Sequence, residues 1–394
     1  MANDLSYYKT PDKTQRIIYL LMGLGLLTLL TGLFAAPERT WVSYLIVVYY
    51  LTGLGMAGLF FIAIQYVAKA GWSVAIRRVP EAMAATLPVA AVGVLALFLG
   101  LHTLYEWSHD ATVAVDPILR EKSGWLNPSF FMIRLTIYFV IWIAFSRVLI
   151  GNSVRQDTNA DLLFTRRNVR NSALFILIGV YTYCLASYDL IMSLQPHWYS
   201  TMFGFLNIAG MFQSGLAMII LLIVLLRKRG YTNIFTTVHL YTLGCLLLAF
   251  SIFWVYLWVS QHMLIWYANI PEETSYYIFR HFGAWGTLSF LNVCLNWLIP
   301  FFILLPRATK RNDTAMAQVA LIILIGRWLD LYIMVAPPVV GAVPAIGLWE
   351  IGLALGMTGV FGFSVTRALS RHRLVPVNDP YLVESLPVAA EHGR

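Results

Sequence analysis

Long apolar runs recur along most of the chain and limit what it can fold into. Each run holds about 18 or more residues, enough to cross the roughly 30 Å of hydrocarbon in a bilayer. In hydrocarbon every backbone polar group must be satisfied internally, so such runs form helices. The predicted spans are residues 16–36, 41–68, 82–102, 129–150, 171–194, 201–226, 235–266, 278–305, 315–336 and 346–369. The sequence therefore predicts an all-α polytopic membrane protein with about ten transmembrane helices.

Composition excludes several other classes of protein. The chain is 59% hydrophobic and 12% charged, whereas soluble domains are about a quarter charged. The three cysteines, Cys184, Cys245 and Cys294, lie inside apolar runs and form no Cys-x-x-Cys spacing. A disulfide scaffold, an iron–sulfur cluster and covalent haem are therefore not expected, and we predict no covalently bound cofactor and no metal site in this chain.

Positive charges alternate between the two sides of the predicted spans. Twenty share one side: Lys9, Lys13, Arg16, Lys69, Arg77, Arg78, Arg147, Arg155, Arg166, Arg167, Arg170, Arg227, Lys228, Arg229, Arg307, Lys310, Arg311, Arg367, Arg371 and Arg373. Four lie on the other: Arg39, Arg120, Lys122 and Arg280. The positive-inside rule predicts that the first side is cytoplasmic, with both termini inside. It also accounts for the net charge of +8 without a nucleic-acid partner.

This orientation places most ionisable groups of the spans in the outer half. The outer groups are His102, Arg134, Asp189, Glu350, and Arg280 and His281, which open the eighth span; Arg327 and Asp330 lie from mid-span outward. His239 lies on the inner side. Ionisable residues inside membrane segments are rare and often functional. We therefore treat Asp189, Arg327, Asp330, Glu350, His239 and Arg134 as candidates for proton transfer.

The two most telling carboxylates differ in their local partners. Arg327 and Asp330 are three residues apart and share a helix face, so they form either a structural ion pair or a functional one. Asp189 has no cation at helical spacing, and Arg134 or Arg327 could supply one from another helix. Its alternatives are proton handling, a structural pair with a partner helix, or an interfacial position beside lipid headgroups.

Histidine spacing gives only weak signals. If the helix continued past His102, then His102, Glu106 and His109 would share a face, a spacing that could bind a metal. A water-facing turn explains it equally well. His239 has no mate at its depth, which argues against a pair of b-type haems. The tail from Leu374 to Arg394 has three prolines and lacks an apolar period, so we expect a mobile cytoplasmic extension.

Three motifs in order resemble a known family. SYDLIMSLQPHWYSTMFG (187–204), MLIWYANIPEET (263–274) and GRWLDLYIMVAPP (326–338) are similar to segments of the NrfD/polysulfide-reductase membrane subunits. More narrowly, they resemble the ActC and ActF types of bacterial alternative complex III, and the modest length resembles the ActF type. The resemblance covers roughly residues 15–370.

The resemblance implies two four-helix bundles flanked by the first and last spans, with boundaries at 1–40, 41–200, 201–337 and 338–394. It implies a bacterial inner-membrane subunit of a quinol:cytochrome c (or high-potential iron–sulfur protein) oxidoreductase. Haem and iron–sulfur clusters would belong to partner subunits on the outer side, beside an ActC-like homologue. Quinone or menaquinone is the implied substrate, with His102, Asp189 and His281 as pocket candidates.

The role of this chain within such a complex stays open at the level of sequence. An ActF-type chain implies a proton route and docking for outer subunits, and the alternative is a quinol-binding subunit. A secondary transporter is a third reading, although inverted repeats and paired broken helices are not visible. A structural anchor for outer subunits is a fourth.

Overall fold

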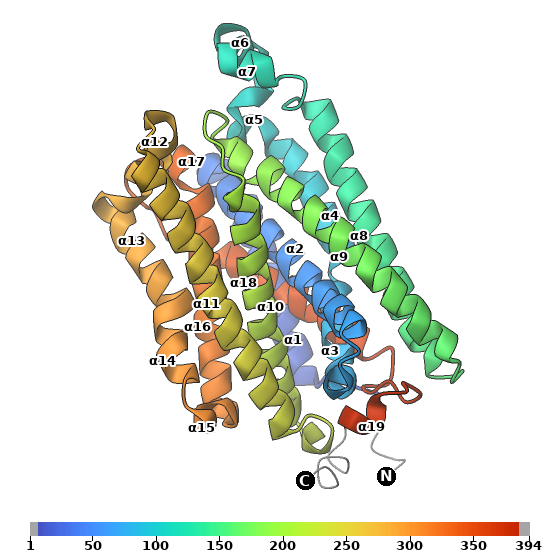
Figure 1. The fold of residues 1–394 in the computed structure, drawn as a ribbon. Helices are drawn as coiled ribbons and strands as arrows, with labels where there is room; N and C mark the ends of the chain where they lie inside the picture. Colours follow the sequence, from blue (N-terminus) through green and yellow to red (C-terminus); the bar gives the residue numbers. More distant parts are fainter. Residues whose placement is uncertain (1–6, 386–394) are drawn as a thin grey trace.

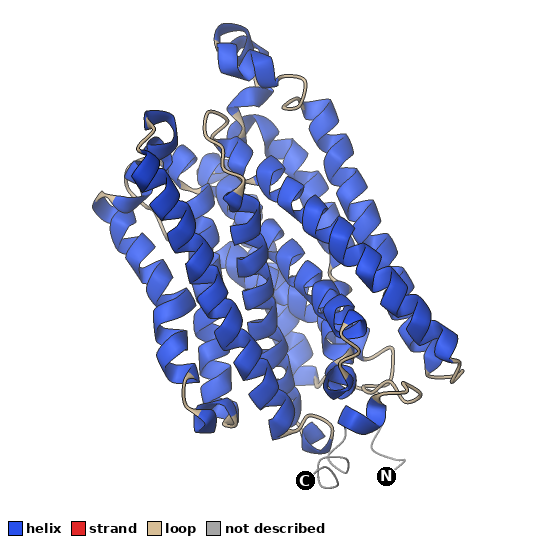
Figure 2. Ribbon diagram, in the orientation of Figure 1, coloured by secondary structure: helices blue, strands red, loops and turns tan. Residues whose placement is uncertain are grey.

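The computed structural model describes residues 7–385 and confirms an all-α polytopic fold (Figures 1 and 2). In this part of the chain ten helical segments are long and apolar enough to span a membrane. They are α1 (Asp12–Ala35), α2 (Pro37–Val67), the interrupted span α3–α5 (Arg78–Ala84, Leu87–Ala96, Leu101–Leu104), α8 (Pro128–Gln156), α9 (Leu162–Leu190), α10 (Met202–Arg227), α11 (Thr237–Ala268), the pair α13 and α14 (Gly283–Val293, Ile299–Leu304), α16 (Asp313–Val335) and α18 (Leu348–Leu369). The chain is thus a multi-pass membrane protein by length and composition of its helices.

The remaining short helices lie within these spans, between them or after the last one. They are η1 (Gly71–Ile76), η2 (Leu97–Gly100), η3 (Glu106–Ser108), α6 (Asp110–Val115), α7 (Pro117–Lys122), η4 (Met192–Leu194), η5 (Tyr231–Asn233), α12 (Pro271–His281), η6 (Cys294–Leu298), α15 (Arg307–Lys310), α17 (Pro337–Val340) and α19 (Leu382–Ser385). Between residues 7 and 385 there is no strand, and a single isolated bridge joins Tyr7 to Arg373.

The spans pack as two four-helix bundles with a flanking pair (Figure 1). The first bundle holds α2, α3–α5, α8 and α9, and the second holds α10, α11, α13–α14 and α16. The flanking helices α1 and α18 pack against each other and against α2. The bundles meet where α10 contacts α2 and α9. Helix α2 is apolar on every side, so it is the span buried most completely.

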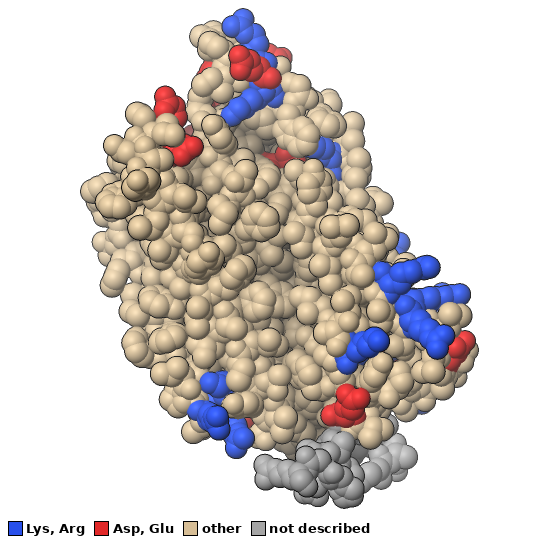
Figure 3. Space-filling view, in the orientation of Figure 1, with Lys and Arg blue, Asp and Glu red and all other residues tan. Residues whose placement is uncertain are grey.

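The first and last described residues lie at the same end of the bundles, which we call the terminal end. The other end, which we call the distal end, carries α6, α7 and α12 (Figure 1). On the face drawn in Figure 3, charged residues gather toward these two ends and leave a broad uncharged band between them. Such a band is what a protein needs where it faces hydrocarbon.

Two predicted spans differ from the structure for local reasons. The span predicted at 82–102 is interrupted near residue 86, where Pro88 has no N–H to donate to the carbonyl of Ala84. The span predicted to begin at residue 278 begins at Gly283 instead, because Gly283 has a φ of +62° and turns the chain. Arg280 therefore lies in the separate helix α12 and does not open the eighth span.

The prediction of a mobile extension from Leu374 onward is wrong as far as residue 385. Leu374 and Val375 are fully buried, and Arg77 forms an ion pair with Asp379. Asp157 accepts a hydrogen bond from the backbone N–H of Val377. Sequence periodicity missed this segment because it is held by contacts to loops and not by a regular apolar face. The remaining part of the prediction, residues 386–394, lies outside the described residues.

Candidate functional site

Asp189 is the centre of a buried cluster at the distal end of the first bundle. Arg134 of α8 donates two hydrogen bonds to its carboxylate, Nε to Oδ2 at 3.0 Å and Nη2 to Oδ1 at 2.8 Å. Trp125 Nε1 donates to Oδ1 at 3.1 Å and Tyr138 Oη donates to Oδ2 at 3.2 Å. The carboxylate is only 1% exposed. Of the two possible partners predicted from the sequence, Arg134 and Arg327, Arg134 is the one that pairs with Asp189.

The cation of this pair is fixed as firmly as the anion. The Arg134 guanidinium lies 4.1 Å from the centre of the Trp125 ring and 4.5 Å from that of Phe130, both cation–π contacts. A third donor, Arg134 Nη1, bonds the carbonyl of Trp125 at 2.8 Å. Asn127 caps the N-terminus of α8 and thereby sets the start of this helix. With four donors on one carboxylate, the Asp189 cluster has the geometry of a rigid joint between α8 and α9.

A cavity of about 470 Å³ opens beside the Asp189 cluster. Its walls come from α7, the loop before α8, and the end of α9 with the turn that follows: Lys122, Trp125, Leu126, Tyr188, Asp189, Met192, Ser193, Pro196, Trp198 and Tyr199. Lys122 Nζ donates to the carbonyl of Pro196 at 2.5 Å, and burial lowers the pKa of Lys122. The aromatic walls and the single carboxylate give this cavity the character of a site for a flat ring.

The second polar cluster, which we call the Asp330 network, lies inside the second bundle. Arg327 Nη1 lies 2.5 Å from Asp330 Oδ2, and both side chains are nearly inaccessible to solvent. Arg327 Nη2 donates to Asn207 Oδ1 at 2.9 Å, which ties α16 to α10. Asn292 Nδ2 of α13 donates to Asp330 Oδ1 at 2.9 Å. About 12 Å of helix rise separates Arg327 from the distal end of α16 at Val335.

The network continues through a distorted helix. Residues Cys294–Leu298 form a π-helical turn, and Pro300 follows Ile299 at the start of α14. Because Pro300 has no N–H, the carbonyl of Asn296 has no partner four residues ahead. Gln213 Nε2 and Ser251 Oγ donate to this carbonyl instead, at 2.6 and 2.5 Å. The proline thus frees a backbone acceptor that links three helices at the centre of the bundle.

Two glycines make room for the network. A Cβ on Gly210 of α10 would lie 2.4 Å from Arg327 Nη1, and a Cβ on Gly326 would lie 2.9 Å from Asn296 Nδ2. Neither position has space for a side chain. The guanidinium of Arg327 therefore lies directly on the backbone of α10.

Three buried polar atoms in and around the network have no hydrogen-bond partner among residues 7–385: Tyr183 Oη, Trp254 Nε1 and Asn296 Oδ1. Trp254 lies one turn along α11 from Ser251, and the Tyr183 ring of α9 lies 5.9 Å from the ring of Tyr49. Orphaned polar atoms in a protein interior are normally satisfied by ordered water. Toward the terminal end the bundle is filled by buried aliphatic side chains such as Leu243, Leu247 and Ile323.

Glu350 and His239 have structural partners. Arg39 Nε and Nη2 bind the Glu350 carboxylate at 3.1 and 2.9 Å, and the backbone N–H of Gly347 donates to it at 2.8 Å. This pair holds the start of α2 against the start of α18. His239 Nδ1 accepts from the backbone N–H of Thr236 at 3.0 Å and caps α11. The structure brings neither of them to the Asp330 network.

The two predicted pocket histidines do not share the cavity at Asp189. His102 is exposed, with Nδ1 3.0 Å from Ser108 Oγ, and the helix that carries it stops at Leu104. The face that would have combined His102, Glu106 and His109 is therefore not formed. His281 ends α12 with its ring 4.8 Å from that of His262, and burial lowers the pKa of His281 to about 4. Among residues 7–385 no group of three His, Cys, Asp or Glu is arranged to hold a metal.

Several residues of the two clusters and of the Glu350 pair are not among the candidates predicted from the sequence. Asn292 and Asn296 are four residues apart in an apolar run that leads to Pro300, and this spacing could have indicated a polar face. Gln213 and Ser251 lie in two different spans, and the structure brings them together at one carbonyl. Arg39, Trp125 and Tyr138 gave no local signal, because each contributes through a helix or loop distant in sequence.

Comparison with known proteins adds no assignment: no protein-family model matches the chain, and no curated protein matches it.

Proposed function

We propose that this chain is an integral membrane subunit of a bacterial quinol:cytochrome c (or high-potential iron–sulfur protein) oxidoreductase of the alternative complex III type, and that its Asp330 network transfers protons. In this proposal the chain lies in the cytoplasmic membrane with both termini inside. It binds no haem or iron–sulfur cluster itself, and outer redox subunits and an ActC-like homologue are its partners. Three sequence motifs and the bias of positive charge support this assignment.

The observation that carries the proton-transfer role is the burial of Asp330 within a hydrogen-bonded chain of polar side chains. This series of hydrogen bonds runs from Asn207 through Arg327 and Asp330 to Asn292 and Asn296. Insertion of a carboxylate at this depth costs about 2.5–3.5 kcal/mol, and ionisable residues at such positions are rare and often functional. The orphaned polar atoms beside it are suited to bind the waters that relay protons. The network lies closer to the distal end of the bundle than to the terminal end. The bias of positive charge assigns the distal end to the outer side.

Docking of outer subunits is proposed at the distal end. Exposed aromatic and aliphatic side chains gather at the end of α11 and along α12: Trp266, Tyr267, Ile270, Ile278 and Phe282. Glu272 and Glu273 of α12 add negative charge to the same end. Apolar surface rimmed by charge is typical of an interface with another protein.

Isolation of the chain from its native membrane tests the assignment to a redox complex. When the tagged chain is purified in mild detergent, a c-type cytochrome is expected to co-purify and to give a Soret band. The same preparation is expected to catalyse quinol-driven reduction of an acceptor. Produced alone in a host without the complex, the chain should have no Soret band. A haem spectrum from the isolated chain, or solute uptake by proteoliposomes that contain only this chain, would contradict the proposal.

A second candidate function, quinol binding by this chain, is favoured by the cavity beside Asp189. Its aromatic walls and its volume of about 470 Å³ suit a quinone head group. Quinol oxidation there would make turnover depend on the Asp189 carboxylate itself. A carboxylate that only joins two helices would not impose that dependence, so variants of the Asp189 pair separate the two roles.

A further inference from the structure

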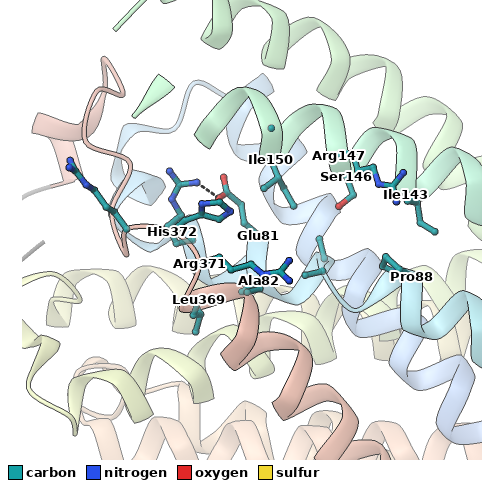
Figure 4. Close-up of a pocket in the computed structure, with 16 residues that line it drawn as sticks. Glu81, Ala82, Pro88, Ile143, Ser146, Arg147, Ile150, Leu369, Arg371 and His372 are labelled. Carbon is teal, nitrogen blue, oxygen red and sulfur yellow. Dashed lines mark hydrogen bonds and ion pairs between the residues drawn. The ribbon is translucent and has the colours of Figure 1, made fainter. Parts of the chain in front are cut away.

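A cavity of about 370 Å³ lies at the terminal end of the first bundle, far from both clusters described above along the helices. Three parts of the chain line it: α3 and the start of α4, the middle and second half of α8, and the end of α18 with the segment that follows it. Figure 4 shows Glu81 of α3, Ser146 and Arg147 of α8, and Arg371 and His372 around this space. The cavity therefore joins the first bundle to the chain that leaves the last span.

Positive charge around this cavity exceeds negative charge. Arg78, Arg147, Arg371 and Arg373 line it, whereas Glu81 is its one acidic residue. Arg78 is already paired, with Glu81 at 2.6 Å and with Asp157 at 2.5 Å. The side chains of Arg147, Arg371 and Arg373 form no ion pair with residues 7–385, and all three are exposed. The cavity thus presents unneutralised guanidinium groups, which bind phosphate oxygens well.

Apolar side chains line the rest of the cavity, between and beside the charged ones. Ala85, Pro88, Ile143 and Ile150 contribute to it. Beside the cavity, α4 and α8 carry exposed aliphatic residues toward the uncharged part of the helices: Val89, Val92 and Val140. A ligand that satisfies both parts of the lining must carry an anionic head and an apolar body.

Two buried polar groups add a further requirement. Glu81 is 4% exposed and its Oε1 has no hydrogen-bond partner among residues 7–385. Ser146, which is 7% exposed, places its hydroxyl on the same cavity. A carboxylate oxygen accepts only from a donor, so the anionic head should also carry a hydroxyl or another donor.

We propose that this cavity binds the headgroup of an anionic phospholipid that also carries a hydroxyl, such as phosphatidylglycerol. Arg147 and Arg371 hold the phosphate, Glu81 accepts from the glycerol hydroxyl, and the acyl chains lie along Pro88 and Ile143. Basic pockets between membrane helices near the headgroup level commonly bind anionic lipids. The site is independent of the proposed role in quinol oxidation, since it lies apart from the Asp330 network.

Binding of lipid to the purified, delipidated full chain tests this inference. We expect phosphatidylglycerol to raise the thermal unfolding midpoint in detergent, and phosphatidylcholine or inorganic phosphate to leave it nearly unchanged. In native mass spectrometry, the variant Arg147→Gln/Arg371→Gln is expected to lose roughly tenfold or more in phosphatidylglycerol affinity, because each arginine adds to attraction for the anionic headgroup. The single variant Arg371→Gln should lose part of it.

The control removes the same charge elsewhere. Arg166 and Arg167 of α9 are exposed and do not line the cavity, so Arg166→Gln/Arg167→Gln should keep the affinity of the unaltered chain. An equal loss of phosphatidylglycerol affinity in both double variants would indicate a general effect of surface charge and would contradict the proposed site. Equal stabilisation by phosphatidylcholine, or by inorganic phosphate at millimolar concentration, would also overturn it. The substituted side chains are exposed, and the unfolding midpoint without lipid confirms that each variant is folded.

Discussion

Replacement of Asp330 by asparagine is expected to slow quinol-driven turnover of the assembled complex at least about tenfold. Asparagine occupies the same volume but cannot bind and release a proton near neutral pH, and positioned acid–base groups typically contribute a factor of a hundred or more. Turnover is measured with the complex purified from native membrane, and assembly by the amount of co-purified cytochrome. Asp313→Asn, on the same helix but at its partly exposed terminal end, should leave turnover unchanged.

The neutral side chain also removes the partner of a buried arginine. Breaking a buried ion pair by changing one member commonly costs about 3–5 kcal/mol, so Asp330→Asn will lower stability as well as activity. The double variant Arg327→Gln/Asp330→Asn separates these effects, because it removes both charges at once. We expect it to regain most of the lost stability while turnover stays low. Recovery of turnover together with stability would assign the pair a structural role only.

Removal of the Asp189 carboxylate is expected to have the largest effect on stability. In Asp189→Ala the Arg134 guanidinium remains buried without its partner, at a cost of about 3–5 kcal/mol. Trp125 Nε1 and Tyr138 Oη lose their acceptor in the same step. The unfolding midpoint in detergent measures this loss. Arg120→Ala, on exposed surface of α7, should change the midpoint little.

A paired apolar replacement shows whether Asp189 does more than join helices. In Arg134→Met/Asp189→Leu both charges are removed, and such replacements are often neutral for stability. We expect this variant to regain part of the lost stability, with the remaining deficit caused by the unpaired Trp125 and Tyr138. Turnover of the assembled double variant should match the unaltered complex. Low turnover in a stable, assembled double variant would favour quinol binding beside Asp189.

Much of the fold follows from local sequence signals. Each span is an apolar run with its own length requirement, so the number and order of spans could be predicted without tertiary information. The ion pair of Arg327 and Asp330 could be predicted for the same reason, because a separation of three residues places both on one helix face. The predicted positions in the membrane left two arginines, Arg134 and Arg327, as possible partners of Asp189. The structure shows Arg134 as the partner.

The features that could not be predicted depend on contacts between distant segments. Arg39 and Glu350 are separated by most of the chain and meet because α18 returns to the start of α2. The segment after residue 374 lacks an apolar period, yet Asp379 anchors it to Arg77. The acceptor at Asn296 exists because Pro300 and a π-helical turn free a carbonyl, and which donors reach it depends on packing of the second bundle. These contacts between distant segments cannot be predicted from the periodicity of the sequence.

A change in the protonation of Asp330 during turnover is the central claim, and infrared difference spectroscopy measures it most directly. Spectra of the assembled complex are recorded between its quinol-reduced and oxidised states, for the unaltered chain and for Asp330→Asn. We predict a carboxyl signal that responds to the redox change, shifts in heavy water and disappears in Asp330→Asn, while Asp313→Asn retains it. Identical carboxyl signals in the unaltered chain and Asp330→Asn would contradict proton transfer through this network.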